Sequence, residues 1–541
     1  MSQIINNITK QNIFKKKRNN NEESDLINKK ELKSKSSLKK ENKDKLLNSK
    51  RLSSRLRNKD KSIIYNEKEL LKKTLHANNT KASINNINNK NKDEIVNNLL
   101  NELGLKEEDS TIPEDCSYSD IETHLIKKEY KNNKMNPLKF KIHKNYKFKA
   151  RASTLTLPHG KVQTPIFMPV GTKAAMKGLL SCDLERMKCM LCLANTYHLT
   201  LQPGDDLIFK GYEGTHNFMN WKRNLLTDSG GFQMVSLIDN ALFTEEGVEF
   251  SSHIKGDNRR LMLTPEKSIE IQNNLGSDII MMLDDVVRPN SDNIRIKDAC
   301  ERTIRWLDRC ILAHKNPETQ NLFPIVQGGL DLELRKWCIK EMIKRDQPGY
   351  AIGGLAGGES KDDFWKVVNV SCQYLPYNKP RYLMGVGYPI DLIVCSLLGV
   401  DMFDCVFPTR TARFGNAFTN YGIISLEKSC YKYDFNPIDD ECDCEVCKTY
   451  TRSYFYVISS KNPRSCSLIS YHNLYYLLRL MSRFRKSIMD HKIQEFVEDF
   501  FMKQFKHLNK ESCLKYIWVL DALKAAEIDT EKIKKLLDGL K

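Results

Sequence analysis

Hydrophobic residues are sparse in the first part of the chain and become regularly spaced after Asn136. From there on, short apolar runs alternate with longer stretches in which apolar residues recur every three or four positions. The first pattern predicts buried strands and the second predicts amphipathic helices. Residues 278–283, for example, predict a strand, and residues 293–314, which include Trp306, predict a helix.

The same alternation repeats along the chain. Before the strand at 278–283, Thr264 and Pro265 predict the start of a helix and Gly276 predicts its end. Repetition of strand, loop and helix predicts parallel strands joined by crossover helices, an α/β fold. The later predicted strands lie at residues 323–326, 350–352 and 381–384, and the helices that follow them begin at residues 330, 361 and 389.

Polar residues and glycines collect where the predicted strands end. A (β/α)8 TIM barrel places its catalytic groups at this end of its strands. An open, doubly wound sheet is the alternative, but six such strand ends from successive units favour a closed barrel. The strand-end groups are Asp228 to Gly231, Asp284 with Asp285, Gln327 to Gly329, Gly353 with Gly354, Gly385 to Gly387, and Asp404.

Composition separates the N-terminal part from the rest. The first 100 residues hold 25 Lys and Arg against 11 Asp and Glu, and therefore carry most of the net charge of +18. Up to Cys116 the only aromatic residues are Phe14 and Tyr65. Such a segment cannot bury enough apolar surface to offset the entropy lost on ordering. We predict a disordered extension at 1–137, a folded domain at 138–507 and a C-terminal helical tail at 508–541.

Charge and cysteine usage limit the possible compartments. No run approaches 18 consecutive apolar residues, so no membrane span is predicted. The first 20 residues lack acidic residues, as an organelle-targeting segment does, but a Lys/Asn-rich tail has the same composition. Sixteen cysteines without a secretory signal favour free thiols and metal ligands in a reducing compartment, which predicts the cytoplasm. Because the chain after residue 100 is nearly neutral, its charge gives little indication of nucleic-acid binding.

Cysteines near the C-terminal end predict a metal site. Cys442, Cys444 and Cys447 lie within six residues, and His472 follows after a gap long enough for a strand and the start of a helix. Three Cys and one His complete a tetrahedral zinc site and leave no position for a catalytic water. We predict one structural Zn²⁺ in a subdomain at about 430–480, inserted in or appended to the barrel. Unrelated buried cysteines are the alternative.

Seven stretches, in their order along the chain, resemble the tRNA-guanine transglycosylase family and specifically its eukaryotic branch, the catalytic subunits of queuine tRNA-ribosyltransferases. The resemblance covers residues from about 138 to 507. It implies a pentosyltransferase that replaces guanine by queuine at wobble position 34 of tRNAs with GUN anticodons, without cutting the RNA. The stretches are residues 228–233, 283–287, 325–329, 351–359, 381–387 and 401–410, and the Cys/His cluster.

The resemblance implies two catalytic carboxylates. Asp404 matches the nucleophile, and Asp228 matches the proton acceptor. Because a carboxyl group with a usual pKa of about 3.9 is ionised at neutral pH, Asp404 can attack the anomeric carbon and form a ribosyl ester. Two such displacements restore the original configuration. Outside this motif, an Asp before Ser-Gly-Gly more often caps a turn or a helix.

Base recognition is implied in the same way. The carboxylate of Asp284 matches the group that accepts two N–H groups of the base, while Gln327 and the Gly354 N–H bind its carbonyl. Adenine would leave these groups unpaired. Phe232 and Met384 match the pair that encloses the ring. The full set of substrate-binding residues implied is Ser229, Phe232, Asp284, Gln327, Gly354, Gly357 and Met384.

Two positions near the base leave alternatives open. Asp285 adjoins Asp284, and the family register favours Asp284 in the pocket and Asp285 behind it or at the surface. Gly357 stands where bacterial members carry Val, and Val286 stands where they carry Cys. A glycine at 357 leaves room for the cyclopentenediol of queuine. The alternative is that Gly357 serves a tight backbone turn.

The resemblance also implies partners. Arg410 and Arg413 match residues that contact the anticodon loop, where the wobble nucleotide must be splayed out to be reached. A heterodimer with a non-catalytic homologous subunit is implied as well. Two alternatives are a transglycosylase for a smaller 7-deazaguanine, and the non-catalytic tRNA-binding subunit itself. Loss of Asp404 or Asp228 would mark the latter, and both are present.

Overall fold

The structure, a computed structural model, describes residues 138–231, 241–251, 260–288, 291–459 and 461–539. All of these residues belong to the compact unit Ile112–Lys541. The predicted disordered extension at 1–137 concerns residues outside this described part.

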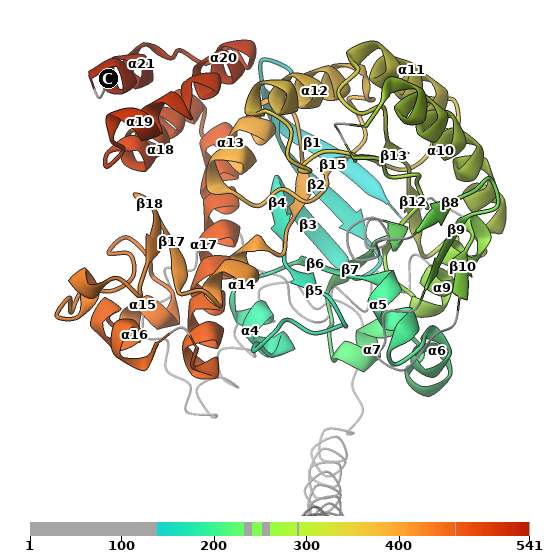
Figure 1. Ribbon diagram of the computed structural model, residues 1–541, viewed down its shortest axis with the longest axis horizontal. Helices are drawn as coiled ribbons and strands as arrows, with labels where there is room; N and C mark the ends of the chain where they lie inside the picture. Colours follow the sequence, from blue (N-terminus) through green and yellow to red (C-terminus); the bar gives the residue numbers. More distant parts are fainter. Residues whose placement is uncertain (1–137, 232–240, 252–259, 289–290, 460, 540–541) are drawn as a thin grey trace, which may run out of the picture. The chain divides into compact units, whose positions relative to one another are not determined.

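Parallel strands form the centre of this unit (Figure 1). They belong to two five-stranded sheets, and every pair within each sheet is parallel. One sheet has the order β12 (Asn321–Phe323), β11 (Ile279–Met281), β7 (Asn224–Thr227), β6 (Leu191–Ala194) and β5 (Val170–Gly171). The other has the order β13 (Ile325–Val326), β14 (Tyr350–Ile352), β15 (Arg381–Leu383), β16 (Met402–Asp404) and β4 (Ile166–Met168).

Two prolines divide what is one closed barrel into these two sheets. Pro169 separates β4 from β5, and Pro324 separates β12 from β13. Proline has no N–H for the ladder, but its carbonyl still accepts a hydrogen bond. The Pro169 carbonyl accepts from Leu193 N–H at 2.9 Å, and that of Pro324 accepts from Ala351 N–H at 2.8 Å. Since β16 also pairs with β4, the strands occupy the eight positions of a (β/α)8 barrel, and the predicted fold is confirmed.

Helices follow the strands and surround the barrel. Thr264 caps the helix after β10 by accepting from Lys267 N–H, and that helix ends at Gly276, where φ is 69°, as predicted. The helix after β13 begins at residue 332 rather than 330, because the Asp331 carboxylate accepts hydrogen bonds from the N–H groups of residues 333 and 334. The helices are α4 (Ser181–Arg186), α5 (Thr196–Leu201), α6 (Asp205–Tyr212), α7 (Thr215–Met219), α9 (Pro265–Leu275), α10 (Asn293–Ala313), α11 (Leu332–Ile343), α12 (Lys361–Tyr374), α13 (Pro389–Leu397), α14 (Phe407–Ala412) and α17 (Pro463–Met489).

Two small antiparallel sheets accompany the barrel. β8 (Leu242–Phe243), β9 (Val248–Ser251) and β10 (Arg260–Leu263) lie between β7 and α9 in the chain. β1 (Lys139–Tyr146), β2 (Ala150–Leu157) and β3 (Gly160–Thr164) precede the first barrel strand.

The β1–β3 sheet contacts the amino ends of the barrel strands. Arg151 in β2 makes two hydrogen bonds, of 2.8 and 2.5 Å, to the carboxylate of Asp401, and both side chains are fully buried. His159, in the turn between β2 and β3, contacts Asp278 through Nδ1 at 2.6 Å. Asp401 and Asp278 immediately precede β16 and β11. The β1–β3 sheet therefore covers this end of the barrel, and the site must form at the opposite, carboxyl end.

A second small core lies between α14 and α17 in the chain. It contains β17 (Asn416–Thr419), β18 (Gly422–Ser425), the 3-10 helix η1 (Ser429–Tyr431), α15 (Glu445–Thr449) and α16 (Arg452–Ile458). Its buried residues form a cluster separate from the barrel core. This cluster is Ala412, Ala417, Leu426, Ile438, Cys444, Val446, Cys447, Phe455, Leu468 and Ile469.

The chain ends in four helices, α18 (Ile493–Phe505), α19 (Lys510–Leu514), α20 (Ile517–Ala525) and α21 (Glu531–Gly539). Trp518 of α20 is buried and belongs to the barrel core cluster, so this region packs on the barrel rather than apart from it. Lys149 beside β2 donates to the Ala525 carbonyl. Among the described residues, no helix combines the length and apolar character that crossing a bilayer would need.

Candidate active site

Asp404 lies at the carboxyl end of β16 and is partly buried. Its Oδ1 accepts hydrogen bonds from the Tyr382 hydroxyl at 2.6 Å and from the Gly385 N–H at 2.8 Å. Gly385 has φ of 76°, a left-handed conformation that glycine adopts without strain and that brings its N–H to the carboxylate. Burial raises the pKa of Asp404, while the two hydrogen bonds oppose that rise by stabilising the ionised form.

Asp228 follows β7, and the end of the neighbouring strand β6 fixes its carboxylate. Oδ2 accepts from the Asn195 side-chain amide at 2.5 Å, and Oδ1 accepts from the Thr196 N–H at 2.8 Å. The pKa of Tyr382 is raised first by burial and then by the charges of Asp404 and Asp228. The charges of both carboxylates therefore act on the same tyrosine, at the carboxyl ends of β16 and β7.

Asp284, after β11, is only 3% exposed. Its Oδ2 accepts a hydrogen bond of 2.6 Å from the Gln327 side-chain amide, and Ser229 Oγ lies 3.5 Å from its Oδ1. Burial raises the pKa of Asp284 to about 7, with a further contribution from the neighbouring charge of Asp285, while the bond from Gln327 lowers it. A carboxyl group at this pKa changes between donor and acceptor near neutrality, which suits a group that binds the edge of a base.

Gly353 and Gly354 follow β14 and form the wall next to Gln327. A Cβ added at Gly354 would lie 2.4 Å from Gln327 Oε1, so only glycine allows this approach. A Cβ at Gly353 would lie 3.0 Å from Gln327 Nε2 and 3.7 Å from Met384 Sδ. Gln327, Gly354 and Met384 therefore lie together at this end of the barrel. Phe232, predicted to enclose the ring opposite Met384, lies outside the described residues.

Glu359 holds the loop between β14 and α12. Its Oε1 accepts from the Ala356 N–H at 2.7 Å, and its Oε2 accepts from the Gly357 N–H at 2.9 Å. Left-handed φ values in this loop occur at Gly354, Ala356 and Gly358, and Gly357 is not among them. Gly357 is exposed, with its N–H bound to Glu359. The backbone conformation therefore does not require a glycine at this position.

Asp285 points away from the base pocket. It is fully buried, and its carboxylate binds Arg295 through hydrogen bonds of 2.9 and 2.6 Å and Arg302 through one of 2.5 Å. Adjacent residues of extended chain face opposite sides, which explains why Asp284 enters the pocket and Asp285 does not. The prediction that Asp285 lies behind Asp284 is confirmed, and the alternative of a surface position is wrong.

Arg410 and Arg413 lie in and directly after α14, the helix that follows Asp404. Both side chains are exposed, and neither forms a hydrogen bond or ion pair within the described part of the chain. Two uncompensated guanidinium groups beside the barrel mouth are available to an anionic ligand such as a phosphate backbone.

The predicted metal ligands come together as a group. Nδ1 of His472 lies 3.7, 3.5 and 3.3 Å from the Sγ atoms of Cys442, Cys444 and Cys447, and all four ligand atoms lie within 4.8 Å of one another. Tetrahedral zinc with ordinary Zn–S and Zn–N bonds requires S to N separations of roughly 3.5 Å. Nε2 of His472 contacts the Phe418 carbonyl at 2.7 Å, so the proton sits there and leaves Nδ1 free to bind a metal.

The segment between Cys447 and His472 is largely helical. Its described residues include α16 and the first turns of α17. Thr451 initiates α16 by accepting from the Tyr454 N–H, and Asn462 and Pro463 initiate α17. The apolar residues in this stretch therefore serve helix packing rather than a sheet.

The metal-binding group is connected to the segment that carries the arginines. Asn473, next to the ligand His472, donates to the carbonyls of Pro408 and Asn416, both at 3.0 Å. Its Oδ1 accepts from the Phe418 N–H at 2.9 Å. Pro408 lies in α14, so a metal ion bound to His472 would fix the register of α17 against the helix that follows Asp404.

A second group, His159, His216 and Asp278, also brings potential ligands together. The two imidazole rings are stacked, with centroids 3.7 Å apart and planes only 15° from parallel. Lone pairs in nearly parallel, stacked planes do not converge on one ion. Both rings instead contact the carboxylate of Asp278, and the His159 contact lowers the pKa of that group. This group is an ionic contact at the amino end of the barrel.

Sequence reasoning missed several residues that shape the site. Tyr382 orients Asp404, and its role follows from alternation, since strand positions 382 and 384 share a face and Met384 was assigned to the pocket. Asn195 and Thr196, which hold Asp228, follow β6 in the same way as the other strand-end groups and could have been found by that signal. The binding of Arg302 to Asp285 had no signal in the sequence.

Comparison with known proteins matches about two thirds of the chain to one family. The family model described as TGT, queuine tRNA-ribosyltransferase, matches residues 147–506. The chain is 49% identical over 388 residues to the queuine tRNA-ribosyltransferase catalytic subunit of Schizosaccharomyces pombe, covering 70% of this chain and 95% of the relative. It is 50% identical over 364 residues to the catalytic subunit of Caenorhabditis elegans, covering 67% of this chain and 90% of the relative.

A bacterial relative is nearly as similar. The queuine tRNA-ribosyltransferase of Caldanaerobacter subterraneus subsp. tengcongensis is 48% identical over 365 residues, which cover 67% of this chain and 96% of the relative. The residues matched by the family model, 147–506, include the barrel strands, Asp228, Asp284 and Asp404 at their carboxyl ends, and the Cys/His group. The chain therefore belongs to the queuine tRNA-ribosyltransferase family, the tRNA-guanine transglycosylases.

Proposed function

We propose that this chain exchanges guanine at wobble position 34 of tRNAs with GUN anticodons for queuine, through a covalent ribosyl ester of Asp404. The observation that supports this most is the arrangement of Asp404, Asp228 and Asp284 at the carboxyl end of one barrel. Each carboxylate has different partners, and each therefore serves a different task. The alternative of a non-catalytic subunit is not favoured, because the nucleophile and the proton acceptor are both present and oriented.

The reaction takes place in two displacements at the anomeric carbon of nucleotide 34. In the first, a carboxylate oxygen of Asp404 bonds to this carbon as its bond to guanine breaks, and the oxocarbenium-like charge is spread while both bonds are partial. In the second, the ring nitrogen of the incoming base bonds to the carbon, and the ester breaks. Two inversions restore the configuration, and the RNA backbone is never cut.

Protons balance across the two steps. Departing guanine gains a proton at the nitrogen that held the ribose, and the incoming base loses one at the equivalent nitrogen. A single group can therefore serve both steps by giving and then accepting a proton. Asp228 is our candidate, because Asn195 and Thr196 hold its carboxylate and it lies close to the same tyrosine as the nucleophile.

Base selection follows from the groups around Asp284. As a carboxylate it accepts two N–H groups from a guanine-like edge, while Gln327, Ser229 and the Gly354 N–H serve the remaining polar positions. Met384 supplies an apolar contact for the ring, and Phe232 is assigned to the other face from the family motif alone. Gly357 is the position that gives the side arm of queuine room. A smaller 7-deazaguanine would not need that space.

For the RNA, we assign Arg410 and Arg413 to the anticodon loop. Phosphate contacts from guanidinium groups hold a loop in register while a single base is splayed into an enzyme pocket. The Cys442, Cys444, Cys447 and His472 group would hold a structural Zn²⁺, because its spacing fits tetrahedral coordination. Its chemical contribution is to close the subdomain, and no step of the exchange passes through it.

We propose further that the active form is a heterodimer with a non-catalytic homologous subunit. Three large apolar side chains of the metal-binding subdomain are strongly exposed, Tyr433 at 75%, Phe435 at 72% and Val457 at 71%. Arg452 at the start of α16 binds the Asp434 carboxylate at 3.1 Å, which joins the segment of the two aromatics to the helix that carries Val457. An apolar surface of this kind fits a protein partner.

Two further assignments complete the proposal. The cysteines of the described part form no disulfide, which suits a reducing compartment, and we assign the enzyme to the cytoplasm. We also keep the division into an extension at 1–137, a catalytic unit at 138–507 that includes the metal-binding subdomain, and a helical tail at 508–541.

The decisive experiment is an exchange assay with unmodified tRNA and labelled guanine, carried out on the chain alone and after co-expression with a candidate partner subunit. Incorporation of label that queuine then displaces would support the proposal. Absence of incorporation with and without the partner would refute it. Incorporation only after co-expression would support the heterodimer as the active form, and full activity of the chain alone would refute that part.

A further inference from the structure

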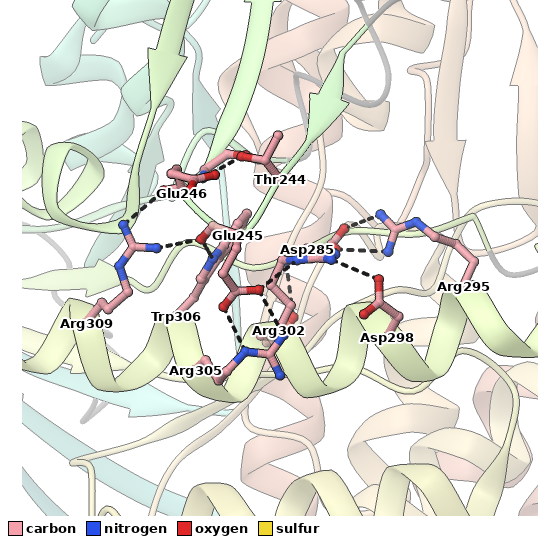
Figure 2. Close-up of polar contacts among 12 residues, drawn as sticks. Thr244, Glu245, Glu246, Asp285, Arg295, Asp298, Arg302, Arg305, Trp306 and Arg309 are labelled. Carbon is pink, nitrogen blue, oxygen red and sulfur yellow. Dashed lines mark hydrogen bonds and ion pairs between the residues drawn. The ribbon is translucent and has the colours of Figure 1, made fainter.

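The β8–β9 hairpin is bound to α10 by a group of ion pairs that extends to the residue next to Asp284 (Figure 2). In the turn of the hairpin, the Glu245 carboxylate binds Arg305 through hydrogen bonds of 2.7 and 2.9 Å. The Glu245 carbonyl accepts from Trp306 Nε1 at 2.9 Å and from Arg309 at 2.7 Å. The turn is therefore fixed through both the side chain and the backbone carbonyl of Glu245.

Arg302 connects this turn to Asp285. Its Nη1 donates to Asp285 Oδ2 at 2.5 Å, and its Nε lies 3.4 Å from Glu245 Oε2. Nη2 is occupied by Asp298, at 2.8 Å on the same helix. The Arg302 side chain is 13% exposed, whereas Arg305 is 49% exposed. Of the two arginines that contact the Glu245 carboxylate, Arg302 is thus the better shielded from solvent and the one that also binds Asp285.

The charge of Asp285 matters to Asp284, its neighbour in the pocket. The carboxylate of Asp285 contributes to raising the pKa of Asp284, after the larger effect of burial. Arg295 and Arg302 oppose this effect because they bind Asp285 directly. The two arginines are seven residues apart in α10, about two helical turns, and so lie on the same face.

Among the described groups around Asp284, Arg335 is a further cation, but it does not bind Asp285. Gln327 and Ser229 are uncharged, and Arg335, behind Gln327, makes its hydrogen bonds to the carbonyls of Gly329 and Val326. The thiol of Cys310 on α10 is buried, which raises its pKa to about 12 and keeps it neutral. Across the pocket, the reaction-centre carboxylates Asp228 and Asp404 add further negative charge at the same barrel end.

We propose that Arg302 is a positioning residue for base recognition, which ties the β8–β9 hairpin to Asp285 and offsets the Asp285 charge so that Asp284 is available as a carboxylate. This inference rests on the proposed function, because it assigns to Asp284 the reading of the base. Arg302 itself does not touch the base. It acts through Asp285, with Arg295 as the second cation.

The test is the pH dependence of guanine exchange by the full chain, with its partner if one is needed. Arg302→Met removes the cation and keeps a long side chain. The acid limb of the kcat/KM profile of this variant should move up by about half to one pH unit. Its kcat/KM should therefore be roughly three- to ten-fold below the parent value near pH 6.5 and approach it near pH 8.5. Arg302→Lys should retain the parent profile, because the charge remains.

Arg305→Met is the matched control, since Arg305 lies on the same helix as Arg302 and binds Glu245 but does not bind Asp285. Its acid limb should stay at the parent position. An equal loss of kcat/KM at every pH in Arg302→Met, or the same shift in both variants, would overturn the inference. If Arg302→Met does not fold, Arg295→Met removes the other, more exposed cation from Asp285. The acid limb should then shift in the same direction, and the absence of a shift would overturn the inference.

A second readout separates this inference from the proposed function. The pH at which the stabilisation of the protein against heat by Asp284→Asn reaches its full value reports the titration of Asp284 in the folded chain, whether or not the chain exchanges guanine. That pH should be higher in the Arg302→Met background and unchanged in the Arg305→Met background. If it moves but the parent exchanges no guanine, the proposed function fails while the link from Arg302 to Asp284 stands. If the parent is active and this pH does not move, only the inference fails.

Discussion

The Tyr382 hydroxyl donates to Oδ1 of Asp404 at 2.6 Å, and the Gly385 N–H donates to the same oxygen at 2.8 Å. Within the described residues, the Asp404 carboxylate accepts hydrogen bonds through Oδ1 alone, which leaves Oδ2 for the attack that we propose. Tyr382 therefore orients the proposed nucleophile and stabilises its ionised form without occupying Oδ2. This arrangement opposes the effect of burial, which raises the pKa of Asp404.

Tyr382→Phe should lower kcat/KM for guanine exchange by roughly 10- to 100-fold, because a hydrogen bond to a charged group contributes about 1.5–3 kcal/mol. The loss should be largest at low pH, since Asp404 loses a donor that favours its carboxylate. Steady-state kinetics over a pH series measures both effects. Tyr374→Phe, at an exposed position on α12, is the matched control and should behave as the parent. Parent-like kinetics in Tyr382→Phe would refute the orienting role.

Asp404→Asn should keep the fold and tRNA binding but form no covalent adduct, because a neutral amide is a poor nucleophile. The measurement is a denaturing gel of enzyme incubated with tRNA, with a melting curve and a binding assay as controls for folding and affinity. A protein–RNA band that survives denaturation in this variant would show that another residue forms the ester.

The pKa of about 7 at Asp284 predicts that base binding strengthens with pH through neutrality. Only the carboxylate accepts two N–H groups, so KM for guanine should be about ten-fold higher at pH 6 than at pH 8. In Asp284→Asn this dependence should disappear along with most of the activity. A KM for guanine that is constant across this range would contradict the assignment.

The same group links pH to stability. Because the folded pKa of Asp284 is raised, the folded state favours the protonated form, and the associated stability is present below the ordinary pKa and lost as pH rises through about 7. Asp284→Asn should therefore raise the free energy of unfolding at pH 8 by on the order of 2–4 kcal/mol and change it little at pH 4. Denaturant titrations at the two pH values measure the difference. Equal effects at both would mean that Asp284 titrates normally.

Cys444→Ser should destabilise the metal-binding subdomain, since a closed structural zinc site contributes on the order of 10 kcal/mol to the folding of small domains. Through Asn473 and its bonds to the Pro408 and Asn416 carbonyls, the damage should reach α14 and weaken tRNA binding. Metal analysis and melting curves test this. Cys466→Ser, a cysteine outside the metal-binding group, is the control. Purified protein without zinc, or a Cys444→Ser variant that melts like the parent, would refute the metal assignment.

Gly357→Val should lower kcat/KM for queuine far more than it lowers kcat/KM for guanine or a smaller 7-deazaguanine. Overpacking the proposed contact between residue 357 and the side arm of queuine costs roughly 1–3 kcal/mol, or about 5- to 150-fold, and only queuine carries the cyclopentenediol that would meet the added methyl groups. The backbone at 357 tolerates a side chain, since the left-handed positions of this loop lie elsewhere. The three bases serve as mutual controls. Equal losses for all of them would show that Gly357 does not select queuine.

The periodicity of the sequence determined the fold class and most helix starts. Helix α9 begins at Thr264 and Pro265 and ends at Gly276, as predicted, because helix caps depend on a few neighbouring residues and are local in sequence. The strand-end motifs come together at one end of the barrel for a similar reason, since parallel strands always bring their carboxyl ends to one face. The metal ligands were identified by spacing, because three of the four lie within six residues.

Only the tertiary structure decided which groups act on one another. That Tyr382 binds Asp404, or that Arg302 joins Glu245 to Asp285, depends on strands and helices that are brought together by closure of the barrel. The pKa of Asp284 likewise depends on burial, which the whole barrel produces and no local pattern encodes. Sequence patterns report contacts between near neighbours in the chain, whereas the strength and charge of an active-site group are set by contacts between residues distant in sequence.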